Sequence, residues 1–478
     1  MKPIPTLDVF ILTFNAAKRE IDIPVFARHI YNAFGQNASS LPEVVVISLQ
    51  EMSPLARAFI GSYVLSPYFE RYESAINIAA TKFAAEEERQ NRPKDSPFTL
   101  VSMHNVGMTG IMLFARDPAA LQNIKVAEVG FGAGDMANKG AVGLRTLYRK
   151  EDTDGSLLAS VELTFVSAHL AAMEWNLNKR NKNWESIVSG LVFEDPRKMV
   201  ENPSMQHALQ DSEDSETQEP LLELDSTEKA IHNISIYKPG SHLFVAGDLN
   251  YRLSKTSPAS DSTFPDVDIE SPNHYARFLA RDQLTTEKCA GRTLQGLSEA
   301  PIKFPPTYKL VLSPKSKPQT ELGRIEVEED DTDEVGWSWA LHRWPGWCDR
   351  VLFLEIPWWV QETVGDIKMK VTAYDAIPAL RSSDHRPVFL RLEVPMLEPT
   401  ELIPTESAYE TDLSAEPVDP RVKLPFPIDF QSWEHRAHVK KWESTIGWSM
   451  LISQSKQGIM AFVTVLLIGL GTWWYRSR

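Results

Sequence analysis

Short apolar runs alternate with stretches of helical apolar spacing over residues 1–395. Runs of four to eight residues that are rich in Val, Ile, Leu and Phe are typical of buried β-strands. We expect strands at 7–14, 44–49, 110–114, 141–147, 161–168, 243–246, 351–354 and 388–392. This alternation predicts an α/β domain over residues 1–395, which the motifs described below identify as the catalytic domain.

The regular pattern stops after residue 395. Residues 396–432 are rich in Pro, Glu and Thr without periodicity, so we expect an extended linker. Residues 433–457 combine tryptophans with cations. This segment either lies along an anionic membrane surface or forms a solvated helix packed on the catalytic domain. Inside the domain, the charged stretches 201–229 and 313–334 predict solvated insertions.

Residues 458–475 contain no charged side chain and end in Trp473, Trp474 and Tyr475. As a helix this segment is about 27 Å long, which matches a thin bilayer. Aromatic residues at its end are typical of a membrane interface. We predict a transmembrane tail anchor, with a buried core helix as the alternative. The short span favours a location in the endoplasmic reticulum membrane, with the catalytic domain in the cytosol. The basic residues at the end of the chain make the mitochondrial outer membrane an alternative location.

Composition narrows the function further. A hydrophobic share of 43% permits a large core. The net charge of −15 argues against binding nucleic acid through a basic face. Two cysteines, Cys289 and Cys348, do not make a disulfide framework, so we expect a reducing compartment. The N-terminal residues are too polar for a secretory signal.

The segment His242 to Leu253 carries the strongest chemical signal. Asp248, Asn250 and Arg252 follow the apolar run 243–246 at every second residue. In extended chain this spacing places the three side chains on one face. A carboxylate, an amide and a guanidinium at the end of a core strand predict a charged ligand, such as a phosphate with a metal ion.

Other polar residues follow the same rule, because each adjoins an apolar run. They are Asn15, Glu51, His169, Asp349, Asp384 and His385. Taken singly, each is more simply a loop residue, a turn-stabilising residue or a satisfied core histidine. Six such positions at strand ends instead predict one cleft where the strands converge. Glu51 is suited to Mg²⁺, which prefers oxygen ligands and often takes one or two carboxylates.

The order of the strings LQE, HLAA, GDLN and SDH resembles that of the deoxyribonuclease I-like metal-dependent phosphoesterases. Four further strings resemble the inositol polyphosphate 5-phosphatases in particular: NKGAV, GDLNYRL, PPTYK, and WCDR together with SDHRPV. The similarity covers about residues 7–395. It implies a four-layer α/β sandwich with two central mixed β-sheets flanked by helices.

The resemblance implies a metal-assisted attack by water. Glu51, aided by Asn15, is expected to hold Mg²⁺ against the scissile phosphate. Asp248 is expected to orient and deprotonate the attacking water. Asn250 is expected to bind the phosphate or that water.

The resemblance also implies hydrogen-bond donors for the phosphoryl group. His385 is expected to donate as charge develops, and Asp349 is expected to fix its tautomer. His169 is expected to add a second donor. Asp384 is expected to organise this corner or to assist the metal.

Substrate specificity is expected from cations and one aromatic residue. By the resemblance these are Lys139, Arg180, Tyr308, Lys309 and Arg343, which suit a substrate with several phosphates. Each cation taken alone is more simply a solvated surface charge.

One departure concerns the 4-phosphate. Leu341 stands where the family often has a second basic residue, so the contact with the 4-phosphate is either weaker or comes from Lys315 or Lys317 of the insertion.

These features predict hydrolysis of the 5-phosphate of phosphatidylinositol 4,5-bisphosphate, giving phosphatidylinositol 4-phosphate and phosphate. The expected tail anchor favours a phosphoinositide lipid over soluble inositol phosphates, since anchoring raises the effective concentration at a surface. Two rivals stay open. One is a nuclease or another phosphodiesterase of the same fold, and the other is an inactive tether that only binds phosphoinositides. The sequence does not indicate an oligomeric state.

Overall fold

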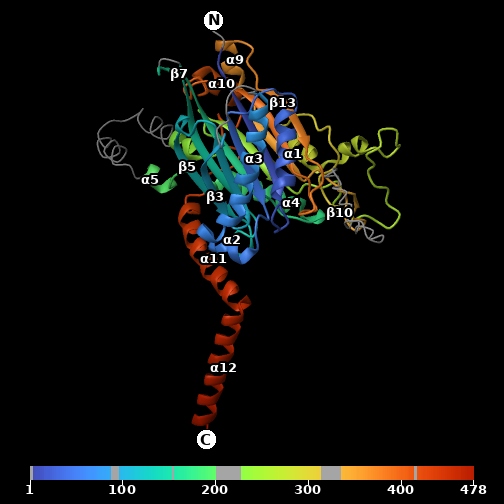
Figure 1. The fold of residues 1–478 in the computed structure, drawn as a ribbon. Helices are drawn as coiled ribbons and strands as arrows, with labels where there is room; N and C mark the ends of the chain where they lie inside the picture. The colour runs from blue at the N-terminus through green and yellow to red at the C-terminus, as the bar shows by residue number, and fades with distance from the viewer. Residues whose placement is uncertain are drawn as a thin grey trace, which may run out of the picture.

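Two six-stranded mixed β-sheets form the centre of the protein (Figure 1). The computed structural model describes residues 4–87, 96–152, 155–200, 228–313, 335–413 and 417–477. The first sheet has the order β13–β14–β1–β2–β4–β3. Its strands are β1 (Thr6–Asn15), β2 (Val44–Gln50), β3 (Thr99–Val106), β4 (Thr109–Ala115), β13 (Lys370–Ala376) and β14 (Val388–Pro395). In it β1 and β2 are parallel, and the other neighbours are antiparallel.

The second sheet has the order β5–β6–β7–β8–β12–β9. Its strands are β5 (Leu121–Gly130), β6 (Gly140–Glu151), β7 (Leu157–His169), β8 (His242–Asp248), β9 (Leu297–Ser298) and β12 (Asp349–Leu354). In it β7 and β8 are parallel. A separate two-stranded ribbon is formed by β10 (Leu310–Leu312) and β11 (Trp337–Trp339).

Both faces of the central strands are buried, which explains why these strands read as nearly continuous apolar runs. In β1, Leu7, Val9 and Ile11 pack into the core between the two sheets. Phe10 and Leu12 point to the opposite face and join a second core with the helices. The period of two along a strand thus divides one apolar run between two layers.

Helices cover the outer faces of the two sheets. The first sheet is covered by α1 (Ile23–Gly35) and α3 (Ser66–Glu87), and the second by α4 (Leu177–Gly190), whose Trp184 and Ile187 are buried. The short helices are α2 (Leu55–Ile60), α5 (Pro196–Val200), α8 (Gln283–Cys289), α9 (Trp358–Val364) and α10 (Glu406–Leu413). The expected α/β fold with two mixed sheets is confirmed.

All eight expected strand positions lie within strands of the structure. The sequence missed β3, β5 and β13, as well as the short strands β9, β10 and β11. The first three lie at or near sheet edges and keep many half-exposed or exposed positions, so no continuous apolar run marks them. Most of the two predicted charged insertions, at 201–227 and 314–334, lies outside the described residues.

The described part of residues 396–432 is not an extended linker. Leu402 and Ala408 are buried in the central core, and Ile428 packs with Val192 and Ile234. Scattered apolar residues therefore hold this segment against the domain, although it lacks a regular period. The prediction failed here because it relied on periodicity and Pro content alone.

Two long helices complete the chain, α11 (Ser432–Gln454) and α12 (Lys456–Arg476). Of the two readings left open for residues 433–457, the structure has the helix packed on the catalytic domain, and α12 projects away from it (Figure 1). Among the residues that the structure describes, no helix is long and apolar enough to cross a membrane. The predicted transmembrane segment 458–475 is therefore not supported.

Candidate active site

The polar residues singled out in the sequence gather at one edge of the two sheets. Strands β1, β2, β7 and β8 end at this edge, and β12 begins there because it is antiparallel to β8. The strand register places Asp248 opposite both His169 and Asp349. Strand order alone therefore brings together residues that lie far apart in the sequence.

Asp248 is at the centre of this cluster and is fully buried. Its Oδ2 atom accepts a hydrogen bond from Asn15 Nδ2 at 2.9 Å and lies 3.3 Å from His169 Nε2. The same oxygen lies 4.0 Å from His385 Nε2. The backbone N–H of Asn250 donates to Oδ1 at 3.1 Å.

These neighbours determine the ionisation of Asp248. Burial raises its pKa, but the hydrogen bond with His169 and the positive charge of His385 outweigh that effect, so the pKa lies well below its usual range. Asp248 therefore stays ionised at neutral pH, and an ionised carboxylate can accept a hydrogen bond from a water molecule and orient it.

His385 forms a buried pair with Asp349. Its Nδ1 atom lies 2.8 Å from Asp349 Oδ2, which also accepts a hydrogen bond from Thr307 Oγ1 at 2.7 Å. Burial lowers the pKa of His385, but the charge and the hydrogen bond of Asp349 more than compensate and raise the pKa to about 9. At neutral pH the ring is therefore a cation, and Nε2 keeps its proton on the side that faces Asp248.

Asn250 and Arg252 form a braced turn behind Asp248. The guanidinium of Arg252 donates to the backbone oxygen of Asn250 at 3.1 Å and also to its side-chain oxygen. Its carbon lies 4.0 Å from the ring centroid of Tyr308. Both residues are buried, and Asn250 Nδ2 donates to Leu170 O at 3.2 Å. In this structure both residues contact protein atoms and support the geometry of Asp248.

Two of the site residues have unusual backbone angles. Glu51 has φ +45° and Asn250 has φ +59°, both in the left-handed region that side chains other than glycine rarely adopt. Such conformations cost about 1–3 kcal/mol and are often found at functional sites. The strain fits a site in which the strand ends must turn sharply to present a side chain.

Glu51 follows β2 and lies partly open to solvent beside Lys18, whose Nζ is 3.2 Å away. Burial raises the pKa of Glu51, but the charges of His169 and Lys139 lower it more. Asn15, the other predicted metal ligand, uses its Oδ1 to accept from Ala17 N at 3.0 Å. The carboxylate of Glu51 is thus the more available oxygen of the two.

Lys139 and His169 complete the inner part of the cluster. Lys139 Nζ contacts His169 Nε2, the same atom that faces Asp248. Burial lowers the pKa of Lys139 to about 8, although Asp248 and Glu51 oppose the shift. Burial and Lys139 also lower the pKa of His169. Lys139 is therefore a cation at neutral pH, held close to the predicted base.

The other predicted substrate residues lie further out. Lys309 Nζ pairs with Asp384 Oδ2 at 2.6 Å, and Arg343 pairs with the buried Glu174 at 2.8 Å. Arg180 is fully buried and donates to Met173 O at 2.6 Å. Arg180 thus holds the segment after His169 in place, and the structure gives it no exposed face with which to contact a substrate.

The cluster fits a hard divalent cation, because its candidate ligands are mostly carboxylate oxygens and it offers few soft ligands such as thiols. Among the described residues, Asp248, Asp349 and His385 have ligand atoms that all lie within 4.8 Å of one another. Asp349 Oδ1 is buried without a hydrogen-bond partner. Asp349 Oδ2 pairs with His385 at 2.8 Å, and both oxygens of Asp248 accept hydrogen bonds. Glu51, which is partly open to solvent, therefore offers the most accessible carboxylate to a metal ion.

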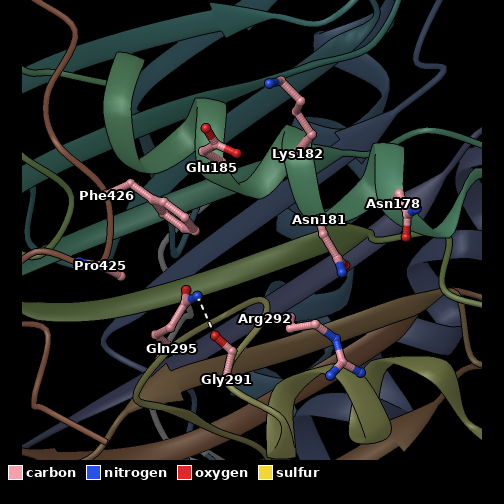
Figure 2. Close-up of a pocket in the computed structure, with 9 residues that line it drawn as sticks. All are labelled: Asn178, Asn181, Lys182, Glu185, Gly291, Arg292, Gln295, Pro425 and Phe426. Atoms are coloured by element: carbon pink, nitrogen blue, oxygen red, sulfur yellow. Dashed lines mark hydrogen bonds between the residues drawn. The ribbon is translucent and has the colours of Figure 1, made fainter.

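A separate cavity of about 580 Å³ lies on the outer side of α4. Figure 2 shows it between Lys182 and Glu185 of this helix and Gly291, Gln295 and Phe426 across the opening. It shares no residue with the catalytic cluster, so we do not assign it to the reaction.

Two site residues were missed by the sequence interpretation. Thr307 holds Asp349, and Ser383 donates to Asn15 O at 2.6 Å while its Oγ accepts from His385 N at 3.0 Å. Both lie inside the strings PPTYK and SDHRPV, next to residues that were predicted. Their hydroxyl groups carry no charge, so no pattern of titratable side chains marks them in the sequence.

The chain is similar in sequence to several curated proteins. Synaptojanin of Caenorhabditis elegans is 26% identical over 307 residues, which cover 63% of this chain and 20% of the relative. Inositol-1,4,5-trisphosphate 5-phosphatase 1 of Schizosaccharomyces pombe is 26% identical over 291 residues, covering 60% and 19%. Human phosphatidylinositol 3,4,5-trisphosphate 5-phosphatase 1 is 24% identical over 299 residues, covering 62% and 20%. The matched regions span about a fifth of the length of these relatives.

Among solved structures, the chain is similar to the inositol polyphosphate 5-phosphatase domain of SPsynaptojanin in complex with inositol (1,4)-bisphosphate and calcium ion. The TM-score is 0.50 at 19% identity, covering 82% of this chain and 85% of the other. This similarity concerns the fold. The model of the Endonuclease/Exonuclease/phosphatase family 2 matches residues 12–391, which is most of the chain, so the protein belongs to that family.

Proposed function

We propose that this protein hydrolyses the 5-phosphate of a phosphoinositide, with phosphatidylinositol 4,5-bisphosphate as the first choice of substrate and Mg²⁺ as the metal. The observation that carries the proposal is the buried cluster in which an ionised Asp248 faces a protonated His385. The names of the relatives, which are 5-phosphatases of inositol phosphates and phosphoinositides, support the substrate class.

The chemistry is an in-line attack by water. Asp248 accepts a proton from the water while the water oxygen bonds to phosphorus. The bond from phosphorus to the inositol oxygen breaks, and that oxygen takes up a proton from the solvent. His385 and Lys139 donate to the phosphoryl oxygens and stabilise the charge that develops there. A Mg²⁺ ion held by Glu51 would supply further charge neutralisation for the phosphate and the leaving oxygen. No covalent enzyme intermediate is needed.

Apolar side chains near the outer cations support a lipid substrate. Met173, Trp175 and Leu341 are exposed, with Trp175 62% and Leu341 74% exposed. Arg343 lies against two of them, because its Nη2 is 3.2 Å from Met173 Sδ and its guanidinium is 6.0 Å from the ring of Trp175. Cations beside apolar groups suit a ligand with an anionic headgroup and acyl chains.

We also propose that the enzyme acts at the cytosolic face of the endoplasmic reticulum membrane. This proposal rests on the lipid substrate and on the exposed apolar side chains of α12, such as Leu467, Ile468 and Trp473. It does not rest on a membrane span. Imaging of a fluorescent fusion of the full chain tests it, and signal confined to mitochondria would contradict it.

A substrate panel tests the activity. The full chain would be assayed for phosphate release from vesicles with phosphatidylinositol mono-, bis- and trisphosphates, and from soluble inositol phosphates, with Mg²⁺ present. We expect the highest kcat/KM on the 4,5-bisphosphate lipid. The Asp248→Ala variant should fold but release no phosphate. Cleavage of a labelled oligonucleotide with no phosphate release would instead indicate a nuclease. Lipid binding without turnover would indicate an inactive tether.

A further inference from the structure

Helix α11 lies beyond residues 12–391, the range matched by the family model, yet it packs closely on the catalytic domain. Figure 1 shows it running along the domain beside α2. Its buried residues are Arg436, Val439, Glu443 and Gly447, which are spaced three or four apart and form one stripe. Two of these four are charged, which is unusual for the buried face of a helix.

The charged pair in this stripe is bidentate. Arg436 and Glu443 form two parallel contacts, with Nη1–Oε1 at 2.9 Å and Nη2–Oε2 at 2.7 Å. Glu443 Oε1 also accepts a hydrogen bond from Ala137 N at 2.6 Å. A buried ion pair contributes little stability by itself because desolvation offsets the attraction. The carboxylate of Glu443 accepts a hydrogen bond from the backbone N–H of Ala137, and an apolar side chain at this position could not do so.

Ala137 is two residues before Lys139 in a tight loop. The loop closes through Gly132 N to Met136 O at 2.8 Å and Phe131 N to Lys139 O at 2.9 Å. Lys139 in turn reaches His169 in the catalytic cluster. Glu443 therefore fixes the backbone from which Lys139 extends.

The same helix also contacts α2, which begins shortly after Glu51. At Gly447 an added Cβ would lie 2.8 Å from Ala56 O and 3.0 Å from Phe59 Cβ, so the two helices are in close contact. At the rim, Lys440 pairs with Glu128 at 2.9 Å. Helix α11 thus touches both segments that lead into the catalytic cluster.

We propose that Glu443 is a positioning residue, which holds the loop of Lys139 in its productive geometry through the hydrogen bond with Ala137 N. This proposal rests on the proposed phosphatase function for its kinetic consequence. The alternative is that α11 only adds stability to the fold.

A pair of double variants isolates the hydrogen-bond acceptor. Arg436→Met with Glu443→Leu removes both charges together and leaves no buried charge unpaired, but it also removes the acceptor for Ala137 N. Arg436→Met with Glu443→Gln removes the same charges and keeps an oxygen at the acceptor position. Lys440→Ala serves as the control for loss of a rim ion pair.

We expect the leucine variant to lose about tenfold or more in kcat/KM, because small displacements of a positioned group are costly. The glutamine variant and the control should stay close to wild type. Amide hydrogen exchange of the peptide spanning residues 131–139 should be faster in the leucine variant alone. In a Lys139→Ala background the leucine and glutamine variants should have equal activity, because the effect acts through Lys139.

Equal kcat/KM and equal exchange in the two double variants would overturn the proposal. An equal loss in both, accompanied by equal loss of thermal stability, would also overturn it and leave α11 with a stabilising role. If the wild type releases no phosphate, the proposed function fails, and the exchange of residues 131–139 still decides whether Glu443 holds the loop.

Discussion

The protonation of His385 at neutral pH depends on Asp349, and this dependence is open to a direct test. The pKa of His385 is raised from 6.5 to about 9, which corresponds to about 3 kcal/mol in favour of the imidazolium at about 1.4 kcal/mol per unit. The charge and the hydrogen bond of Asp349 at 2.8 Å are the main favourable causes, acting against burial. Asp349→Asn removes the charge and keeps a similar shape.

Loss of one close carboxylate lowers the pKa of a paired cation by about 1–3 units. His385 is protonated below its pKa, so phosphate release by the wild type should decline as the pH rises through about 9. In Asp349→Asn we expect this decline between about pH 6 and pH 8. The assay is the pH dependence of kcat at saturating substrate from pH 5.5 to 10 on a soluble inositol phosphate, which avoids effects of lipid ionisation and of the rise in KM expected from Lys139 above pH 8.

The free energy of unfolding should also depend on the protonation of His385. Since the folded pKa of His385 lies above the unfolded value, its contribution to the free energy of unfolding is complete below about pH 6.5 and is lost as the pH rises through about 9. Asp349→Asn should reduce this contribution, as measured by thermal unfolding across the same pH range. Asp282→Asn, which changes a buried carboxylate paired with Arg350, is the control for a general loss of stability.

If the activity of Asp349→Asn also declined only near pH 9, the reasoning would be refuted. The raised pKa of His385 would then be caused by other groups. A matching shift in Asp282→Asn would refute the reasoning as well, since that carboxylate does not contact His385.

Three further outcomes are expected. Removal of divalent cations by a chelator should reduce phosphate release by about a hundredfold or more, and Mg²⁺ should restore it, whereas in Glu51→Gln more Mg²⁺ should be needed. Lys139, with a pKa of about 8, should give a KM that rises as the pH passes 8, and this rise should be absent in Lys139→Met. Lys309→Met should raise KM for a 4,5-bisphosphate by about tenfold and leave KM for a substrate without a 4-phosphate nearly unchanged, as measured by the same phosphate-release assay.

The central strands and most of the catalytic cluster could be predicted from the sequence. Strands buried on both faces leave continuous apolar runs, and the polar residues that follow them are conspicuous because charge beside a core is costly. Asp248 and His385 were therefore found with their partners. The edge strands β3, β5 and β13 were missed, since half-exposed strands leave no such run.

Arg180 shows where pattern recognition reached its limit. Its place after the HLAA string indicated contact with substrate, but the structure buries its guanidinium against the backbone oxygens of Ala171 and Met173. A cation near a site can bind a ligand or fix a loop, and the sequence does not distinguish these uses because both require hydrogen-bond donors.

The sequence by itself determined which residues are candidates for the chemistry, because charged and amide side chains at strand ends have few structural uses. Only the tertiary structure decided how they are held. The pairing of Asp349 with His385 depends on the register between strands, and the contact of Glu443 with Ala137 joins residues 306 positions apart. Local patterns contain no information about such contacts, since they arise when distant segments pack against each other. Helix α11 is thus held on the domain by tertiary packing together with polar contacts such as Glu443–Ala137 and Lys440–Glu128.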